Sequence, residues 1–135
     1  MRNIIQKIRT DLVNTPEVQA IVGARVFPQR VDLEQDTGKY PSIAFSFIGG
    51  FPDRDNYEYN NQMLEFMFIS DKSIDESIKT YEAVNSLLNK KYYVDPDIGL
   101  YFRVTEDSKP IDFSGVFGNN ILYIYTNTYR LRVIG

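Results

Sequence analysis

The C-terminal segment Ile121 to Ile134 carries aromatic or aliphatic side chains at nearly every second position over 14 residues, a pattern typical of a β-strand rather than a helix. Six of these side chains share one side of the strand: Ile121, Tyr123, Tyr125, Tyr129, Leu131 and Val133. The opposite side carries Thr126, Thr128, Arg130 and Arg132. At roughly 3.3 Å per residue the strand would span about 46 Å, whereas most strands have five or six residues. We therefore predict a sheet whose last strand bends or extends beyond its own core.

Three segments carry helix signals. Residues 2–13 place Ile4, Ile8 and Leu12 on one face, as in an amphipathic helix. Thr15–Val22 has Pro at its first helical position and Gly23 after its end, which predicts a short second helix with Thr15 as N-cap. The third helix starts from a capping box, Ser73 with Glu76, and continues to Asn89. Its expected apolar face consists of Ile74, Ile78, Tyr81, Val84, Leu87 and Leu88.

Shorter strands are predicted between these helices and before the last strand. Residues 25–28 form a short extended piece, and Ser42–Ile48 alternates before Gly49-Gly50 ends it. Met63–Ile69 is apolar on both sides, so we expect it to be central in the sheet or covered by a neighbouring subunit. Residues 100–105 alternate again, and a charged loop is expected before the turn at Gly118-Asn119-Asn120.

These elements predict one α+β domain over residues 1–135. Its sheet should be mixed but largely antiparallel, with two main helices packed against it. The length of 135 residues fits a single core, and 43% apolar residues fit a folded chain. No apolar run approaches the roughly 18 residues of a membrane span, so no membrane partner is expected.

The composition excludes several kinds of chemistry. The chain has no Cys and no His, which rules out thiolate metal sites, cysteine nucleophiles and histidine bases. It also lacks the glycine-rich phosphate-binding and nucleophile-elbow motifs, and no cofactor is expected. Any catalysis would depend on carboxylates, Ser, Thr, Lys or Tyr. We therefore expect a protein that is not an enzyme.

Two groups of acidic residues are candidate sites. Asp53, Asp55 and Glu58 resemble the carboxylates of a divalent-ion site, but Arg54 lies among them and their spacing is typical of a solvated loop. Asp95-Pro96-Asp97 could pair its oxygens, although this pattern is more typical of a turn. Neither group predicts a metal centre.

Charge is distributed unevenly along the chain. Residues 1–30 hold five basic and two acidic residues, whereas residues 31–90 hold five basic and eleven acidic residues. The net charge of -3 argues against a protein that grips nucleic acid through clustered Lys and Arg. The separation of sign could let one copy attract the next in a ring.

The order of these segments is similar to that of the tail terminator, or tail-completion, family of tailed bacteriophages, also called tail-to-head joining proteins. The resemblance covers nearly the whole chain. It rests on Gly23-Ala24-Arg25-Val26-Phe27-Pro28, on Tyr40-Pro41-Ser42-Ile43 about a dozen residues later, and on the order of the helices and strands around them. The segment Phe51–Gln62 is a departure from the family pattern.

The resemblance implies a structural role in the virion. Six copies would form a ring that caps the completed tail tube, stops elongation and docks to the head connector. The implied partners are further copies of the chain, the tail tube protein and the head-connector or neck protein. DNA would pass through the ring without specific binding. The implied location is the head–tail junction, after assembly in the host cytoplasm.

Other interpretations remain open at this point. A different neck, connector or baseplate ring component would share these features, and an adaptor that binds one host protein would also lack catalytic motifs. A small carboxylate-dependent metal enzyme belongs to a third class. For the ring, fixed negative charge would repel phosphate from the channel. The candidate interface or channel residues are Asp32, Glu34, Asp36, Asp53, Asp55 and Glu58.

Overall fold

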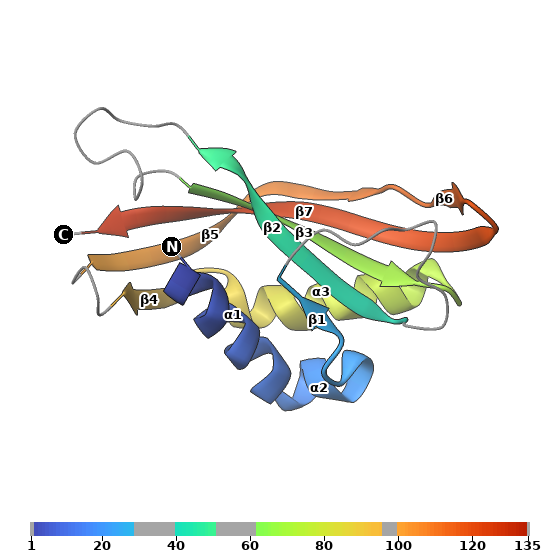
Figure 1. Ribbon diagram of the computed structural model, residues 1–135, viewed down its shortest axis with the longest axis horizontal. Coiled ribbons are helices and arrows are strands. Elements are labelled where there is room, and N and C mark those ends of the chain that lie inside the picture. Colours follow the sequence, from blue (N-terminus) through green and yellow to red (C-terminus); the bar gives the residue numbers. More distant parts are fainter. Residues whose placement is uncertain (1, 29–39, 51–61, 96–99, 135) are drawn as a thin grey trace.

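The computed structural model describes residues 2–28, 40–50, 62–95 and 100–134. Figure 1 shows the elements formed by these residues. In chain order they are α1 (Arg2–Asn14), α2 (Pro16–Val22), β1 (Val26–Phe27), β2 (Ser42–Gly50), β3 (Gln62–Ser70), α3 (Ile74–Leu88), β4 (Tyr92–Asp95), β5 (Leu100–Asp112), β6 (Gly115–Phe117) and β7 (Asn120–Ile134).

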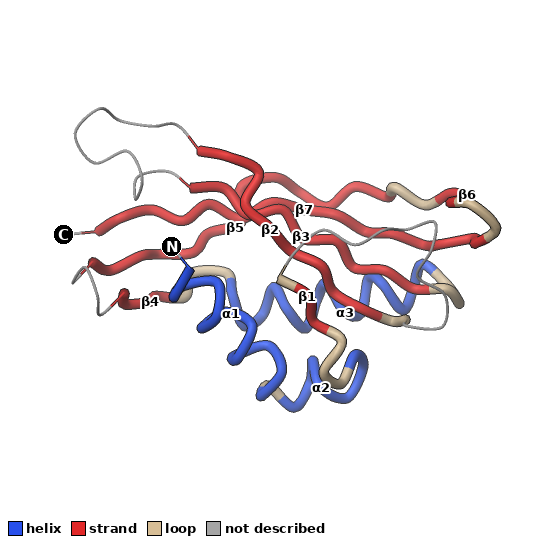
Figure 2. The backbone as a smooth tube through the Cα atoms, viewed as in Figure 1, coloured by secondary structure: helices blue, strands red, loops and turns tan. Residues whose placement is uncertain are grey.

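The strands form one mixed sheet in the order β1-β2-β3-β7-β5-β4, with β6 paired to β7 off this path. β1 runs parallel to β2, and every other described strand pair is antiparallel. The three helices lie together on one side of this sheet (Figure 2). The α+β class and the largely antiparallel sheet predicted from the sequence are therefore confirmed.

The main core lies between the helices and one face of the sheet. The helical face predicted for residues 2–13 is confirmed, because Ile4, Ile8 and Leu12 are fully buried. Phe66 of β3 lies at the centre of an aromatic group, stacked on Phe45 and edge-on to Tyr129. Other fully buried members of this core are Val18, Val22, Ile43, Leu64, Phe68, Val84, Leu88, Phe102, Val104 and Leu131.

The predicted length of the last strand is also confirmed, since β7 has 15 residues. Tyr129 and Leu131 are buried on the side of the helices, whereas Leu122 and Ile124 are buried on the opposite side in a small second cluster. The strand β3, predicted to be central, lies between β2 and β7. Figure 1 shows β7 and β6 extending past the start of α3 as a projecting hairpin.

The short helix α2 has Pro16 at its start, but its N-cap works differently from the prediction. The Thr15 hydroxyl makes no capping bond and instead donates to the carbonyl of Asp11 in the last turn of α1, at 2.7 Å. The side chain therefore stabilises the corner between the two helices. Among the described residues, no helix has the length and apolar character needed to cross a bilayer.

The prediction of a loop after residue 105 is wrong. β5 continues to Asp112 and pairs with β7, and after two residues β6 pairs with β7 again. Irregular register between Glu106 and Ile111 interrupts the alternation, so the strand pattern is weak in the sequence. The edge strand β4 was also not predicted, and β2 continues through Gly49-Gly50 past a register shift.

The buried face of α3 differs in part from the predicted apolar face. Ser77 and Thr80 are buried, whereas Ile78 is only partly buried. The Ser77 hydroxyl donates to the carbonyl of Tyr123 in β7 at 2.7 Å, and Thr80 donates to the carbonyl of Glu76 at 2.8 Å. Small side chains whose hydroxyls are satisfied let the helix backbone lie close to the sheet.

Candidate functional site

All six predicted channel residues, Asp32, Glu34, Asp36, Asp53, Asp55 and Glu58, lie outside the described residues. Their role therefore stays a prediction. Within the described part of the chain, no group of three or more acidic side chains could hold a metal ion. Three other places carry polar or exposed side chains: a cleft beside α1, a polar cluster under α3, and the two ends of the sheet.

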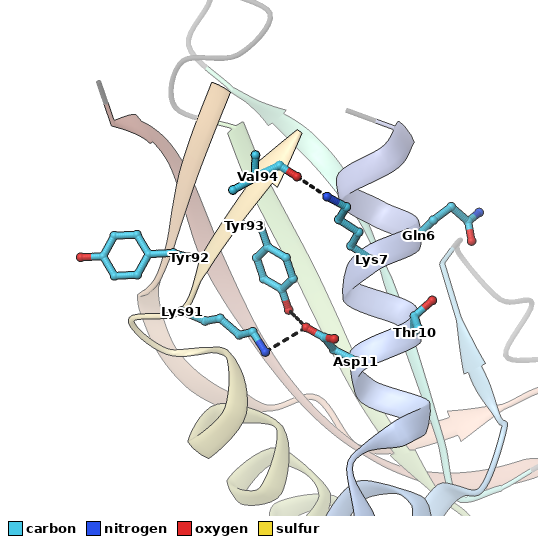
Figure 3. Close-up of a pocket in the computed structure, with 8 residues that line it drawn as sticks. All are labelled: Gln6, Lys7, Thr10, Asp11, Lys91, Tyr92, Tyr93 and Val94. Carbon is cyan, nitrogen blue, oxygen red and sulfur yellow. Dashed lines mark hydrogen bonds and ion pairs between the residues drawn. The ribbon is translucent and has the colours of Figure 1, made fainter. Parts of the chain in front are cut away.

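The cleft lies between α1 and the edge strand β4 and has a volume of about 460 Å³ (Figure 3). Each of its charged groups has a bonding partner within the protein. The Lys91 ammonium lies 2.9 Å from Oδ2 of Asp11, and the Tyr93 phenol donates to the same oxygen at 2.7 Å. The Lys7 ammonium donates to the carbonyl of Val94 on β4. These contacts attach the edge strand to the helix and account for the polar groups of the cleft.

Burial and the neighbouring Asp11 carboxylate raise the pKa of Tyr93 far above its usual value. The phenol therefore stays protonated at neutral pH and cannot act as a base there. The Asp11 carboxylate beside it is already bound to this phenol and to the Lys91 ammonium, so the arrangement supports a packing role.

A second polar cluster joins α3 to the sheet. Oε2 of Glu106 accepts hydrogen bonds from the Tyr81 phenol at 2.6 Å and from Nδ2 of Asn127 at 2.9 Å. The Tyr129 phenol donates to Oδ1 of Asn85 on α3 at 2.8 Å. Burial is the main cause that raises the pKa of Tyr81 and of Tyr129, and Glu106 adds to it. One hydrogen-bonded carboxylate among protonated phenols locks the helix in place and offers no acid–base pair.

The projecting hairpin exposes large apolar side chains on both of its faces. We call Ile111, Phe113, Val116 and Ile121, with the carboxylate of Asp112, the hairpin surface. The four apolar residues are between 56% and 72% exposed. Val116 lies opposite Ile121 on the helix side, whereas Ile111 lies opposite Thr126 on the other side, where Phe113 contacts Phe117. Exposed clusters of this kind mark binding sites in soluble proteins.

A second exposed group lies at the other end of the sheet, on the face away from the helices. We call Tyr92, Val94, Tyr101, Arg103 and Arg132 the tyrosine–arginine surface. Register places Arg103 between Tyr92 on β4 and Arg132 on β7. The Arg103 guanidinium lies 5.6 Å from the centre of the Tyr92 ring. Figure 3 shows Tyr92 pointing away from α1, on the opposite side of β4 from Tyr93.

Sequence reasoning missed most of these surface residues. Ile111, Phe113 and Val116 fall in the segment expected to be a loop, and Tyr92 and Val94 fall in the strand that was not predicted. Signals were nevertheless present. Val116-Phe117-Gly118-Asn119 followed by an alternating strand is typical of a β-hairpin, and Gly118 has a positive φ of 62° in that turn. No protein-family model matches the chain, and no curated protein matches it significantly.

Proposed function

We propose that this protein is a structural virion protein that caps a phage tail tube as a hexameric ring. In this role it stops tail elongation and provides the surface to which the head connector docks. Its partners are further copies of itself, the tail tube protein and the connector, and its place is the head–tail junction. DNA passes through the ring without being held by it.

One observation carries the proposal: the domain exposes large hydrophobic side chains in two different surfaces at opposite ends of its sheet. Seven of the eight large hydrophobic side chains that are exposed in the described residues belong to these ends. A ring built head to tail requires two unlike patches on each copy, because one patch must fit the other on the next copy. The segment order that resembles tail terminators supports the same role.

The polar clusters also support a structural role. In the cleft beside α1 and under α3, the described carboxylates Asp11 and Glu106 each bind a tyrosine phenol and a second side chain. These bonds fix helices to strands, so we expect the domain to behave as a rigid block between its two exposed ends. A rigid subunit suits a ring that has to match the repeat of a tube.

The test is assembly on tail tubes. Native mass spectrometry of the concentrated protein and negative-stain imaging of tube-bound protein should show sixfold rings at tube ends. A free monomer in dilute solution agrees with the proposal, since the tube end can act as template. Closed dimers under both conditions would contradict it, as would binding along the sides of tubes.

A second measurement separates the proposal from a metal enzyme. A ligand that binds only the native state raises the melting temperature by mass action. We expect magnesium or manganese at millimolar concentration to leave the melting temperature unchanged. A large increase that disappears when Asp53 and Asp55 are replaced by Ala would indicate a divalent-ion site.

A further inference from the structure

We propose that the hairpin surface of one copy docks on the tyrosine–arginine surface of the next copy, head to tail. The inference rests on the proposed function in one respect: this contact is the one that repeats around the ring. It names the residues on both sides of that contact. The occupant of each surface is thus a second copy of this chain.

Both surfaces expose large side chains to solvent. Ile111, Phe113, Val116 and Ile121 together expose on the order of 500 Å² of largely apolar surface, divided between the two faces of the hairpin. That is more than half of one partner's share in a standard interface of about 800 Å². At the other end of the sheet, Tyr92 is 55% exposed and Tyr101 is 52% exposed. Partly exposed tyrosines are typical of interface centres.

Charge supplies the second argument. Arg103 and Arg132 lie directly opposite each other on neighbouring strands, an unfavourable pairing of like charges. Within the described residues neither has an ion pair, and Nε of Arg103 is buried without a hydrogen-bond partner. A carboxylate from another molecule would offset the repulsion between the two arginines and accept a hydrogen bond from Nε of Arg103.

The hairpin surface brings such a carboxylate. Asp112 lies opposite Tyr125, on the same face of the hairpin as Val116 and Ile121, and its Oδ1 accepts a hydrogen bond from the backbone N–H of Ser114 at 2.8 Å. Hydrogen bonds from Ser114 also keep the pKa of Asp112 below its usual range, so the group is ionised at neutral pH. The apolar patch therefore carries a fixed negative charge, and the tyrosine–arginine surface carries two positive charges.

Geometry excludes the two simpler pairings. Ile121 and Arg132 are eleven residues apart on β7, or about 36 Å at 3.3 Å per residue, so one copy cannot bring its own two surfaces together. A twofold dimer through either surface would bring charges of the same sign from both copies into one interface, arginines at one end and Asp112 at the other. Only a head-to-tail contact joins opposite charges. Figure 1 shows the hairpin and β4 at opposite ends of the long axis.

Single-stranded nucleic acid is the other occupant that an aromatic surface with arginines suggests. The observations favour a second copy, because nucleic acid would leave the apolar hairpin surface unexplained and the chain has a net charge of -3. Fluorescence anisotropy with a labelled oligonucleotide distinguishes the two. Binding by the wild type that is lost in Arg103→Glu would overturn the proposal.

Cysteine cross-linking tests the contact, because the chain has no Cys of its own. Two single variants are prepared, Ile111→Cys on the hairpin surface and Val94→Cys on the tyrosine–arginine surface. Mixed under conditions in which rings form, they should give a disulfide-linked dimer on mild oxidation, whereas each variant alone should not. A mixture of Val94→Cys with Glu82→Cys, an exposed position on α3, serves as the control. Cross-linking of either variant with itself would overturn the head-to-tail arrangement.

A charge swap tests the same contact by a second route. Arg103→Glu and Asp112→Arg should each weaken association at least about tenfold, and the double variant should recover most of this loss. Melting temperatures should stay within about 3 °C of the wild type, which shows that the variants fold. Equal weakening without recovery in the double variant would contradict the proposal.

The outcomes separate this contact from the proposed function. Sixfold rings on tube ends without the mixed cross-link would overturn the contact and leave the function intact. The mixed cross-link in open filaments, with no rings on tubes, would support the contact and contradict the function. A wild-type protein that stays monomeric under every condition, tube ends included, would overturn both.

Discussion

The phenol of Tyr93 donates a 2.7 Å hydrogen bond to Oδ2 of Asp11, which joins the edge strand β4 to helix α1. The same oxygen lies 2.9 Å from the ammonium of Lys91. Tyr93 and Tyr92 are neighbours that point to opposite sides of β4 (Figure 3). The buried tyrosine therefore fixes the strand from which the exposed one is presented.

Replacing Tyr93 by Phe should destabilise the domain. The change leaves the packed ring but removes a hydrogen bond to a charged partner, so we expect a loss of about 1–3 kcal/mol in the free energy of unfolding. Urea denaturation measures it. Tyr92→Phe is the matched control, and because that side chain is 55% exposed its effect should stay within about 0.5 kcal/mol. Equal effects of the two changes would contradict the assigned role of the bond.

Stability should decrease in alkaline solution. Burial raises the pKa of Tyr81, Tyr93 and Tyr129 in the folded protein, whereas in the unfolded chain it stays near 10. A raised folded pKa means that the folded state holds the proton more tightly. The stabilisation is thus complete below about pH 10 and is lost as the pH rises above that value.

The free energy of unfolding should fall steeply with pH because of the two most buried phenols. Tyr93 and Tyr129 should each contribute a loss of up to about 1.4 kcal/mol per pH unit above pH 10. Urea denaturation at a series of pH values measures this slope. Tyr129→Phe should lower it, whereas Tyr101→Phe, at an exposed position, should not. A free energy of unfolding that stays constant up to pH 11 would contradict the raised pKa values of the buried phenols.

The aromatic group around Phe66 should dominate the stability of the core. Phe66 is fully buried, with its ring centre 4.8 Å from that of Phe45 and 5.2 Å from that of Tyr129. Phe66→Ala should therefore cost about 3–5 kcal/mol in the free energy of unfolding. Phe113→Ala removes the same side chain from the hairpin surface, where 56% of it is exposed, and should cost under about 1 kcal/mol. If Phe113→Ala also fails to impair assembly, the hairpin surface is not an interface.

The regular elements could be predicted from the sequence because their burial is periodic. α1 buries Ile4, Ile8 and Leu12 at helical spacing, and β3 buries Leu64, Phe66 and Phe68 at strand spacing. In each case one side faces the core, so the pattern of side chains reflects the fold. The capping box also predicted the start of α3, since the Ser73 side chain accepts from the backbone N–H of Glu76.

The surfaces could not be predicted in the same way, and the reason is physical. The hairpin projects beyond the core, so Ile111, Val116 and Ile121 are exposed on both of its faces and show no clean alternation. The tyrosine–arginine surface depends on register: only the pairing of β4, β5 and β7 places Tyr92, Arg103 and Arg132 side by side. Contacts between strands distant in sequence leave no local signal.

The proposed ring makes a final prediction about its channel. Passage of DNA requires a lining that does not retain phosphate, so acidic or neutral side chains are favoured there. Residues 31–90 carry eleven acidic and five basic residues, which makes this part of the chain the expected source of the lining. Fluorescence anisotropy with a short duplex at low ionic strength should show no binding by the unmodified protein. Replacing Asp32, Glu34 and Asp36 by Lys should create binding that weakens as salt is added.

A control separates the position of these charges from their number. Asp71, Asp75 and Glu82 are exposed in and beside α3, and replacing them by Lys changes the net charge by the same amount. If the channel variant and the control bind duplex equally, net charge alone explains the result and the lining lies elsewhere. If the channel variant also retains DNA inside rings mounted on tube ends while the control releases it, the acidic segment lines the path. Salt-sensitive, sub-micromolar duplex binding by the unmodified protein would contradict passage without retention, because each phosphate entering the ring would then meet an attractive rather than a repulsive wall.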